Sequence, residues 1–183
     1  AQCQQLQMAV QPNQDLRVTG TFVAKQLNFI AKTTPTFPGS PADAFFFDTC
    51  SISVAGAASA KFESLTVIYN NQLAGIPTLI GSNQIAKIRR DGPPTVRING
   101  TIDFQDMQEF NDFRVQSEFG LKANFIKANS FSMLIDVPRV VFTDVPVRVA
   151  GKGRITVDFT ANGRYHTGSA TQIKVSLTTT QSF

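Results

Sequence analysis

The sequence predicts a mainly β fold: an antiparallel β-sandwich or barrel with one flanking α-helix at about residues 106–117 and long loops. Three observations lead to this prediction. Several short segments alternate apolar and polar residues, which is typical of half-buried strands. Asn, Gly and Pro residues that favour turns separate these segments. One segment follows helical spacing instead, with apolar residues at Met107, Phe110 and Phe113.

Length and composition favour a single domain. The chain has 183 residues, and we expect an N-terminal arm at 1–15, one β domain at 16–177 and a C-terminal tail at 178–183. Charged residues make up 16% of the chain, below the usual share of about 25%. A low charge fits a protein that covers much of its exterior with partners, and it equally fits a polar surface rich in Thr, Ser, Asn and Gln.

The charge pattern disfavours two classes of function. The net charge is +4, and Lys and Arg are scattered singly apart from Arg89-Arg90. A nucleic-acid reader clusters its cations on one face, so specific DNA binding is disfavoured. No apolar run approaches the roughly 20 residues that span a bilayer, so we expect no membrane insertion.

The cysteines, Cys3 and Cys50, are expected to be free thiols rather than a disulfide.

The first strand is expected from Leu16, where residues 16–24 alternate, with a partner at 26–31. A Pro-rich and Phe-rich loop follows at 32–48, KTTPTFPGSPADAFFFD, because proline cannot donate to a strand ladder. A loop of this length is functional or disordered, and its phenylalanines argue against disorder. They pack into the core or contact another subunit, with equal weight, and the contact candidates are Phe37, Phe45, Phe46 and Phe47.

Two further strands are predicted at residues 50–55 and 62–69. Residues 50–55 form a short strand, and 56–59 form a turn of small residues. Residues 62–69 alternate until Asn70-Asn71 ends the strand, since Asn tolerates a left-handed turn conformation. Residues 72–92 are irregular, and their evenly spread apolar residues indicate a packed connection.

Residues 94–104 form the clearest strand, with apolar residues facing a core and Gly100 as a bend or bulge. Its opposite row is polar: Arg97, Asn99, Thr101 and Asp103. The helix follows, capped by Gln105 or Asp106. Its apolar residues Met107, Phe110 and Phe113 are expected to be buried.

The last third predicts more strands. One strand or strand pair spans 124–137, and Pro138 and Pro146 bound the next segment. Residues 152–161 alternate, Asn162-Gly163 is a strong hairpin signal, and 172–177 return. The outward row of this hairpin is Arg154, Thr156, Asp158 and Thr160.

Motifs for chemistry are sparse, so we expect no enzyme, no metal site and no cofactor. The single His166 lies beside a turn without a marked partner, and one His with two distant cysteines makes a poor zinc set. Acidic residues from Asp103 to Asp112 are explained by the dipole of the helix start. The two polar rows mix cations, anions and neutral groups, whereas a phosphate-gripping surface stacks cations. Such rows are typical of a surface exposed to solvent, or of one that lines a water-filled lumen through which DNA slides.

Two segments carry a resemblance to a known family. FESLTVIYNNQL (62–73) and TVRINGTIDFQDMQEFNDF (95–113) pair an Asn-Asn-terminated strand with a Gly-Thr strand that leads into an acidic, aromatic helix. Over residues 61–159 the chain resembles the tail tube proteins of long-tailed bacteriophages, to which type VI secretion tubes are similar. The resemblance implies hexameric rings that stack into a hollow tube. It also implies that the loop at 32–48 contacts a neighbouring subunit and that the polar rows line the lumen.

The resemblance therefore implies a structural virion protein, the major tail tube subunit, whose tube conducts DNA during ejection. Its expected partners are copies of itself, other tail proteins and DNA in transient, non-specific contact. Its expected location is the virion tail, assembled in the cytoplasm of a bacterial host. Two alternatives remain: another phage β-module (distal tail, terminator or capsid-decorating protein), and a ligand-binding β-sandwich, which usually exposes Trp or Tyr. The chain has no Trp.

Overall fold

The structure is a computed structural model. It describes residues 1–25, 45–77, 85–105, 107–127, 131–146 and 154–178. Three sequence predictions lie outside these residues: the strand at 26–31, most of the loop at 32–48 including Phe37, and nearly all of the tail at 178–183. The division of the chain into arm, single domain and tail stays a prediction as a whole.

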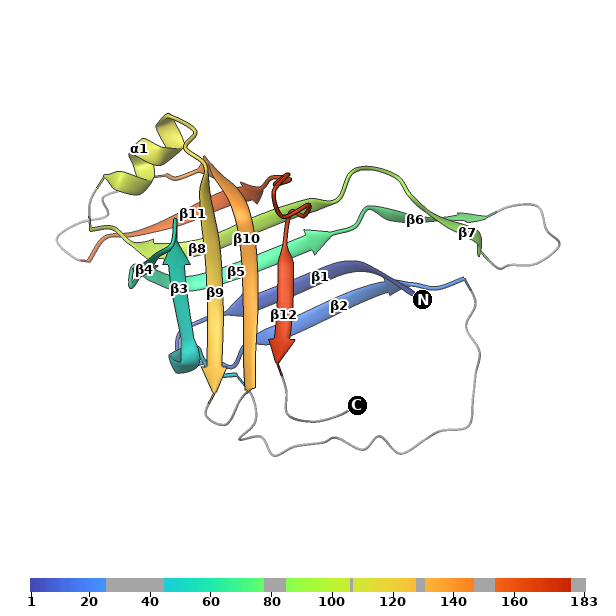
Figure 1. Cartoon of the computed structure of the whole chain (residues 1–183), viewed down its shortest axis with the longest axis horizontal. Helices are drawn as coiled ribbons and strands as arrows, with labels where there is room; N and C mark the ends of the chain where they lie inside the picture. The colour runs from blue at the N-terminus through green and yellow to red at the C-terminus, as the bar shows by residue number, and fades with distance from the viewer. Residues whose placement is uncertain (26–44, 78–84, 106, 128–130, 147–153, 179–183) are drawn as a thin grey trace.

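Within the described residues, ten antiparallel strands form one hydrogen-bonded sheet that folds over into two layers. Figure 1 shows the layers crossing each other. The rear layer holds, in spatial order, β2 (Arg17–Val23), β1 (Gln2–Val10), β5 (Phe62–Asn70), β8 (Thr95–Asp103) and β11 (Thr156–Gly163). The front layer holds β12 (Lys174–Thr178), β10 (Phe131–Asp144), β9 (Phe119–Lys127), β3 (Cys50–Val54) and β4 (Ala57–Ser59). The ladder is not closed, so the predicted mainly β, sandwich-like fold is confirmed.

Strand β10 belongs to both layers. Its first half pairs with β9 and β12, while Val140 to Asp144 pair with β11. The register shifts between Val137 and Val140, and Pro138 lies in that shift. Proline is tolerated at a bulge because no ladder hydrogen bond needs its missing N–H. The prediction that Pro138 ends a strand is therefore wrong.

The core lies between the layers and is built by the alternation that the sequence shows. Phe125 and Ile98 are fully buried, and Met8, Val67 and Val157 are 1% exposed. Four phenylalanine rings run through this core in successive contacts. Their centroids are 5.7, 5.5 and 4.8 Å apart along the series Phe62, Phe159, Phe142, Phe119. Aromatic pairs at such separations add stability beyond the apolar area that they bury.

The N-terminal segment differs from the expected arm. Gln2–Val10 is strand β1, paired with β2 on one side and β5 on the other. Its Met8 and Val10 are buried in the core. The Gln-rich composition concealed an alternating pattern, in which Leu6, Met8 and Val10 face inward.

Residues 72–92 also differ from the expected packed connection. Strands β6 (Leu73–Pro77) and β7 (Ile85–Arg90) pair with each other in a separate two-stranded sheet. They continue the β5–β8 hairpin away from the sandwich, as Figure 1 shows. From here on, the arm means β6 and β7 and not the N-terminal arm expected at 1–15. It follows Gln72, whose φ is +52°.

Helix α1 (Gln108–Arg114) lies within the predicted range 106–117. Met107 occupies its N-cap position without a side-chain cap, so Gln105 does not cap it as expected; Asp106 lies outside the described residues. Phe113 packs against the core and contacts Phe110, but Met107 is 47% exposed. Phe110 and Phe113 are half-buried rather than buried, and the prediction that Met107 is buried is wrong.

The predicted Asn162-Gly163 turn lies inside β11, where Asn162 and Gly163 pair with β8. A Cβ on Gly163 would come within 2.8 Å of Val96 Cβ, so close packing explains this glycine. A tight turn instead joins β3 to β4 at Ala55 (φ +51°) and Gly56 (φ +85°).

Candidate functional site

The outer surface of the rear layer is lined by hydroxyl and amide side chains. Strand register brings them together, because residues opposite each other in an antiparallel ladder share a face. Thr101 of β8 is opposite Ser64 of β5 and Asp158 of β11. We call this surface the polar face. Its residues, strand by strand, are Arg17, Thr19, Thr21; Gln5, Gln7, Ala9; Ser64, Thr66, Ile68, Asn70; Arg97, Asn99, Thr101, Asp103; and Thr156, Asp158, Thr160, Asn162.

Side chains on the polar face bind each other across strands. Ser64 Oγ donates to Thr101 Oγ1 (3.2 Å), and Thr101 Oγ1 donates to Asp158 Oδ1 (2.7 Å). Thr160 Oγ1 donates to Asn99 Oδ1 at 3.3 Å. These bonds pair the hydroxyls of Ser64, Thr101 and Thr160 within the subunit, so fewer groups remain to bind a ligand.

Arg154 joins the polar face at its edge. Its Nε is 2.8 Å from Asp103 Oδ1, and its Nη2 is 2.7 Å from Glu63 Oε1. The hydrogen bond from Arg154, helped by one from Gln105, holds the pKa of Asp103 below its usual range. The same carboxylate raises the pKa of Arg154. Both groups therefore stay charged at neutral pH.

Charge on the polar face is balanced. Together with its neighbours Arg154 and Glu63 it carries three cations (Arg17, Arg97, Arg154) and three carboxylates (Glu63, Asp103, Asp158). The rest is hydroxyl, amide or small apolar. Such a surface attracts neither polyanions nor polycations strongly.

The structure brings the predicted polar rows together. Arg97, Asn99, Thr101 and Asp103 alternate along β8, and Thr156, Asp158 and Thr160 face them from β11. Whether these residues face a lumen stays a prediction. Sequence reasoning missed Gln5 and Gln7, since β1 was expected to be an arm. Their alternation with Leu6 and Met8 is the signal that would have found them.

The Phe45-Phe46-Phe47 run divides between the core and the surface. Phe45 packs against Phe125, with ring centroids 6.1 Å apart. Phe46 and Phe47 remain 37% and 38% exposed and contact each other edge to face. They precede and begin a 3-10 turn, η2 (Phe47–Thr49). We call this exposed pair the Phe knob.

The chain segment between β1 and β2 holds the Phe knob in place. Leu16 N–H donates to Phe45 O (2.7 Å), and Phe47 N–H donates to Gln14 O (3.2 Å). An isolated bridge joins Asp15 to Phe46. Asp15 lies beside the knob through this bridge, and the exposed Asp48 follows Phe47 directly in sequence.

An apolar pocket of about 670 Å³ lies where the arm meets the sandwich. Its walls come from β1, β5, the arm base and the segment before β12, and it holds both tyrosines of the chain. Asn71 Oδ1 accepts from Tyr69 Oη (3.2 Å) and from Arg90 Nη2 (2.8 Å), which fixes two of the lining side chains. Gln172 Oε1 in the wall is shielded from solvent and has no hydrogen-bond donor among the described residues.

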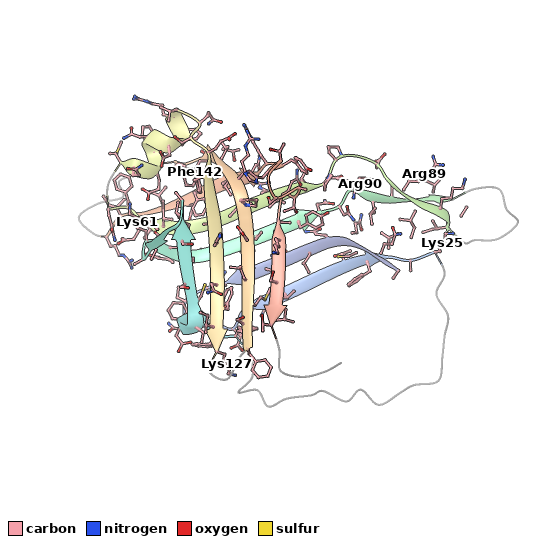
Figure 2. The ribbon with its side chains drawn as sticks, in the orientation of Figure 1. Lys25, Lys61, Arg89, Arg90, Lys127 and Phe142 are labelled. Atoms are coloured by element: carbon pink, nitrogen blue, oxygen red, sulfur yellow. The ribbon has the colours of Figure 1, made fainter. Side chains whose placement is uncertain are left out.

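Cations gather on the arm beside this pocket. Lys87, Arg89 and Arg90 of β7 are exposed, and Lys25 O accepts from Ile85 N–H at 3.3 Å. Figure 2 shows Lys25, Arg89 and Arg90 along this part of the molecule. Asp91 is the nearest acidic residue in sequence. The basic surplus is thus local, although the sequence shows only a single Arg-Arg pair.

The acidic cluster around the helix is held by partners within the chain. Glu109 binds Lys61 at 2.9 Å, Asp103 binds Arg154, and Asp112 accepts from Gln108. In the described residues, no group of three His, Cys, Asp or Glu side chains converges as metal ligands would. His166 Nδ1 accepts from Ser169 N–H within a turn. The described part of the chain also contains no helix with the length and apolarity needed to cross a membrane.

Comparison with known proteins gives one family. A family sequence model described as "Phage tail tube protein" matches residues 1–163. No curated protein sequence matches the chain. One similar solved structure is described as "Virion of native gene transfer agent (GTA) particle"; it is 13% identical, and the match covers 73% of this chain and 98% of that one at a TM-score of 0.48. That similarity is too weak to carry a conclusion about function.

Proposed function

Because the chain belongs to the phage tail tube protein family, we propose that it is the major tail tube subunit, whose copies form stacked hexameric rings around a lumen that conducts DNA. Family membership makes the protein a structural component of a virion. The role needs no catalytic step. Its partners would be copies of itself and other tail proteins, assembled in the cytoplasm of the bacterial host.

The polar face is the observation that carries the lumen proposal. DNA passing through a tube must not be held, so the wall has to avoid stacked cations that release counterions on binding phosphate. The polar face meets this requirement, with balanced charge and cross-strand hydrogen bonds that occupy the hydroxyls of Ser64, Thr101 and Thr160. A wide, hydrated surface of this kind would let DNA slide in transient contact.

Free strand edges and the arm would supply the contacts between subunits. Among the described residues, β2 pairs only with β1, and β12 pairs only with β10. Both edges expose apolar side chains, including Phe22 at 63% and Leu177 at 59%. Exposed edges of this kind are templates for pairing with another chain. The arm projects beyond the sandwich and would reach a subunit of the next ring, while the edges and the Phe knob would act within a ring.

Negative-stain microscopy and size-exclusion chromatography of the purified protein test assembly. We expect rings or tubes on the order of 100 Å across, from six domains with radii of about 16 Å. A persistent monomer at high concentration would contradict the proposed function.

Cysteine labelling tests which surface faces the lumen. With Cys3 and Cys50 replaced by Ser, Thr156→Cys places one thiol on the polar face, and Lys122→Cys places a matched thiol on the outer surface of the front layer. Both should react with a 5 kDa maleimide polymer in free subunits. In tubes, Thr156→Cys should react only with a small maleimide that enters the lumen, while Lys122→Cys should keep reacting with the polymer. Unchanged polymer labelling of Thr156→Cys in tubes would place the polar face outside.

A further inference from the structure

We propose that the Phe knob of one subunit inserts into the apolar pocket of a second copy, forming a head-to-tail contact between neighbouring subunits. The inference rests on the proposed function, because it names the two surfaces that would join copies of the chain. Three observations carry it: the composition of the pocket, the exposure of the knob, and the charges around each.

The pocket has the composition of a binding site for an apolar group. Leu6, Ile173 and Val175 line it together with Tyr69, Tyr165 and Arg90. Tyr and Arg are among the residue types most enriched at the energetic centres of protein interfaces. A volume of about 670 Å³ is within the range of pockets that enclose a ligand.

The pocket also contains an unmet hydrogen-bonding group. Gln172 Oε1 is buried, yet no donor among the described residues reaches it. Buried acceptors in proteins are paired in the great majority of cases. The phenylalanine rings of a second copy would not supply this donor, so the pairing would need a backbone N–H or a polar side chain beside them.

The Phe knob is an exposed group of matching character. Two phenylalanine rings stand together on a turn that backbone hydrogen bonds fix to the β1–β2 connection. Because their position is fixed before contact, little conformational entropy is lost when they are buried by a partner. Phe47 also lines a smaller cavity of its own chain with Val10 and Leu65.

Charges favour the pairing of these two surfaces. Asp15, Asp48 and one cation, Arg17, surround the knob, whereas Arg90 lines the pocket and Arg89 and Lys87 follow further along β7. The matching signs would orient the two copies during encounter.

Knob and pocket lie at different positions along β2. Asp15 beside the knob precedes β2, whereas Leu6 of the pocket pairs with Gly20, so about five residues of strand, or about 17 Å at about 3.3 Å per residue, separate them. Figure 1 shows β3, which follows the knob, and the arm on opposite sides of the molecule. A contact between two different surfaces can repeat from one copy to the next. It closes into a ring when the rotation between neighbouring subunits divides a full turn evenly.

Charge reversal in two single variants tests the pairing. Asp48→Arg and Arg90→Asp should each raise the protein concentration needed for assembly about tenfold or more, because like charges would then meet in the contact. An equimolar mixture of the two variants should assemble again. When the two variants alternate, the introduced arginine of one meets the introduced aspartate of the other, and the unaltered Asp48 and Arg90 meet in the remaining contacts. The double variant Asp48→Arg/Arg90→Asp should assemble for the same reason, since its knob and pocket again carry opposite charges.

Two further variants complete the experiment. Arg114→Asp makes the same charge change on α1, away from both surfaces, and should assemble like the unaltered protein. Phe46→Ser/Phe47→Ser should abolish assembly while the circular dichroism spectrum is kept, since both side chains are over one-third exposed.

Assembly is read by sedimentation and negative-stain microscopy. If the unaltered protein forms tubes and the single variants do so equally well, or the mixture fails to recover, the knob–pocket contact is refuted and the tube function stands. If the unaltered protein forms no rings or tubes, both proposals are refuted.

Discussion

The fit between Gly100 and its neighbours leads to a quantitative prediction about β8. A Cβ built on Gly100 would lie 2.4 Å from Ser64 O and 2.8 Å from a ring carbon of Phe159. The oxygen belongs to the backbone of β5 at its bulge, between Phe62 and Ser64, so it cannot rotate away. Overfilling a packed site typically costs about 1–3 kcal/mol, from which the lower chain entropy of Ala recovers about 0.5–1 kcal/mol.

We therefore expect Gly100→Ala to lower the free energy of unfolding by about 1–2 kcal/mol. For a domain of this length, that corresponds to a fall in Tm of about 2–8 °C. The assay is urea and thermal unfolding of the unassembled subunit, followed by circular dichroism. Gly92→Ala is the matched control, because its Cβ would meet only Gln72 carbons at 3.9 Å. A Gly100→Ala variant as stable as the Gly92→Ala control would refute the steric argument.

Two further predictions concern titration. Burial raises the pKa of the Cys50 thiol to about 11, so at pH 8 its thiolate is roughly 100-fold rarer than for an ordinary thiol. Alkylation of Cys50 by iodoacetamide, measured by mass spectrometry, should therefore be slow in the folded protein and faster in urea. Fast labelling without denaturant would contradict this. Arg154→Gln should return the pKa of Asp103 upward toward its usual value, as followed by NMR titration. Because the folded pKa of Asp103 is depressed, the stability lost in this variant should be seen at neutral pH and should vanish as the pH falls through that pKa. An unchanged Asp103 titration would contradict the ion pair.

Strand alternation predicted most of the rear layer, because a half-buried strand imposes a period of two on its residues. The β5 and β8 segments, and the start of β3 at Cys50, agree with the structure within a few residues. Proline and glycine misled the prediction at Pro138 and Gly163, where tertiary context overrides local preference. Pro138 lies in a bulge that needs no donor, and Gly163 makes room for Val96 and Val137.

The candidate site was predictable in its rows but not in its extent. Alternation shows which side chains share a face of one strand, but it does not say which strands are neighbours. Thr101 and Asp158 are far apart in sequence and meet only because β8 and β11 pair. The apolar pocket was not predictable at all, since its walls come from four separate segments of the chain.

Sharing β10 between two layers has a mechanical consequence. In most stacked sheets, side-chain packing alone resists sliding of one sheet over the other. Here the backbone of β10 passes from one sheet to the other through Pro138. A shearing force would therefore have to break hydrogen bonds of β10 before the two layers could slide past each other. The amide protons of Val140 and Val141 would accordingly be among the last to exchange with deuterated solvent.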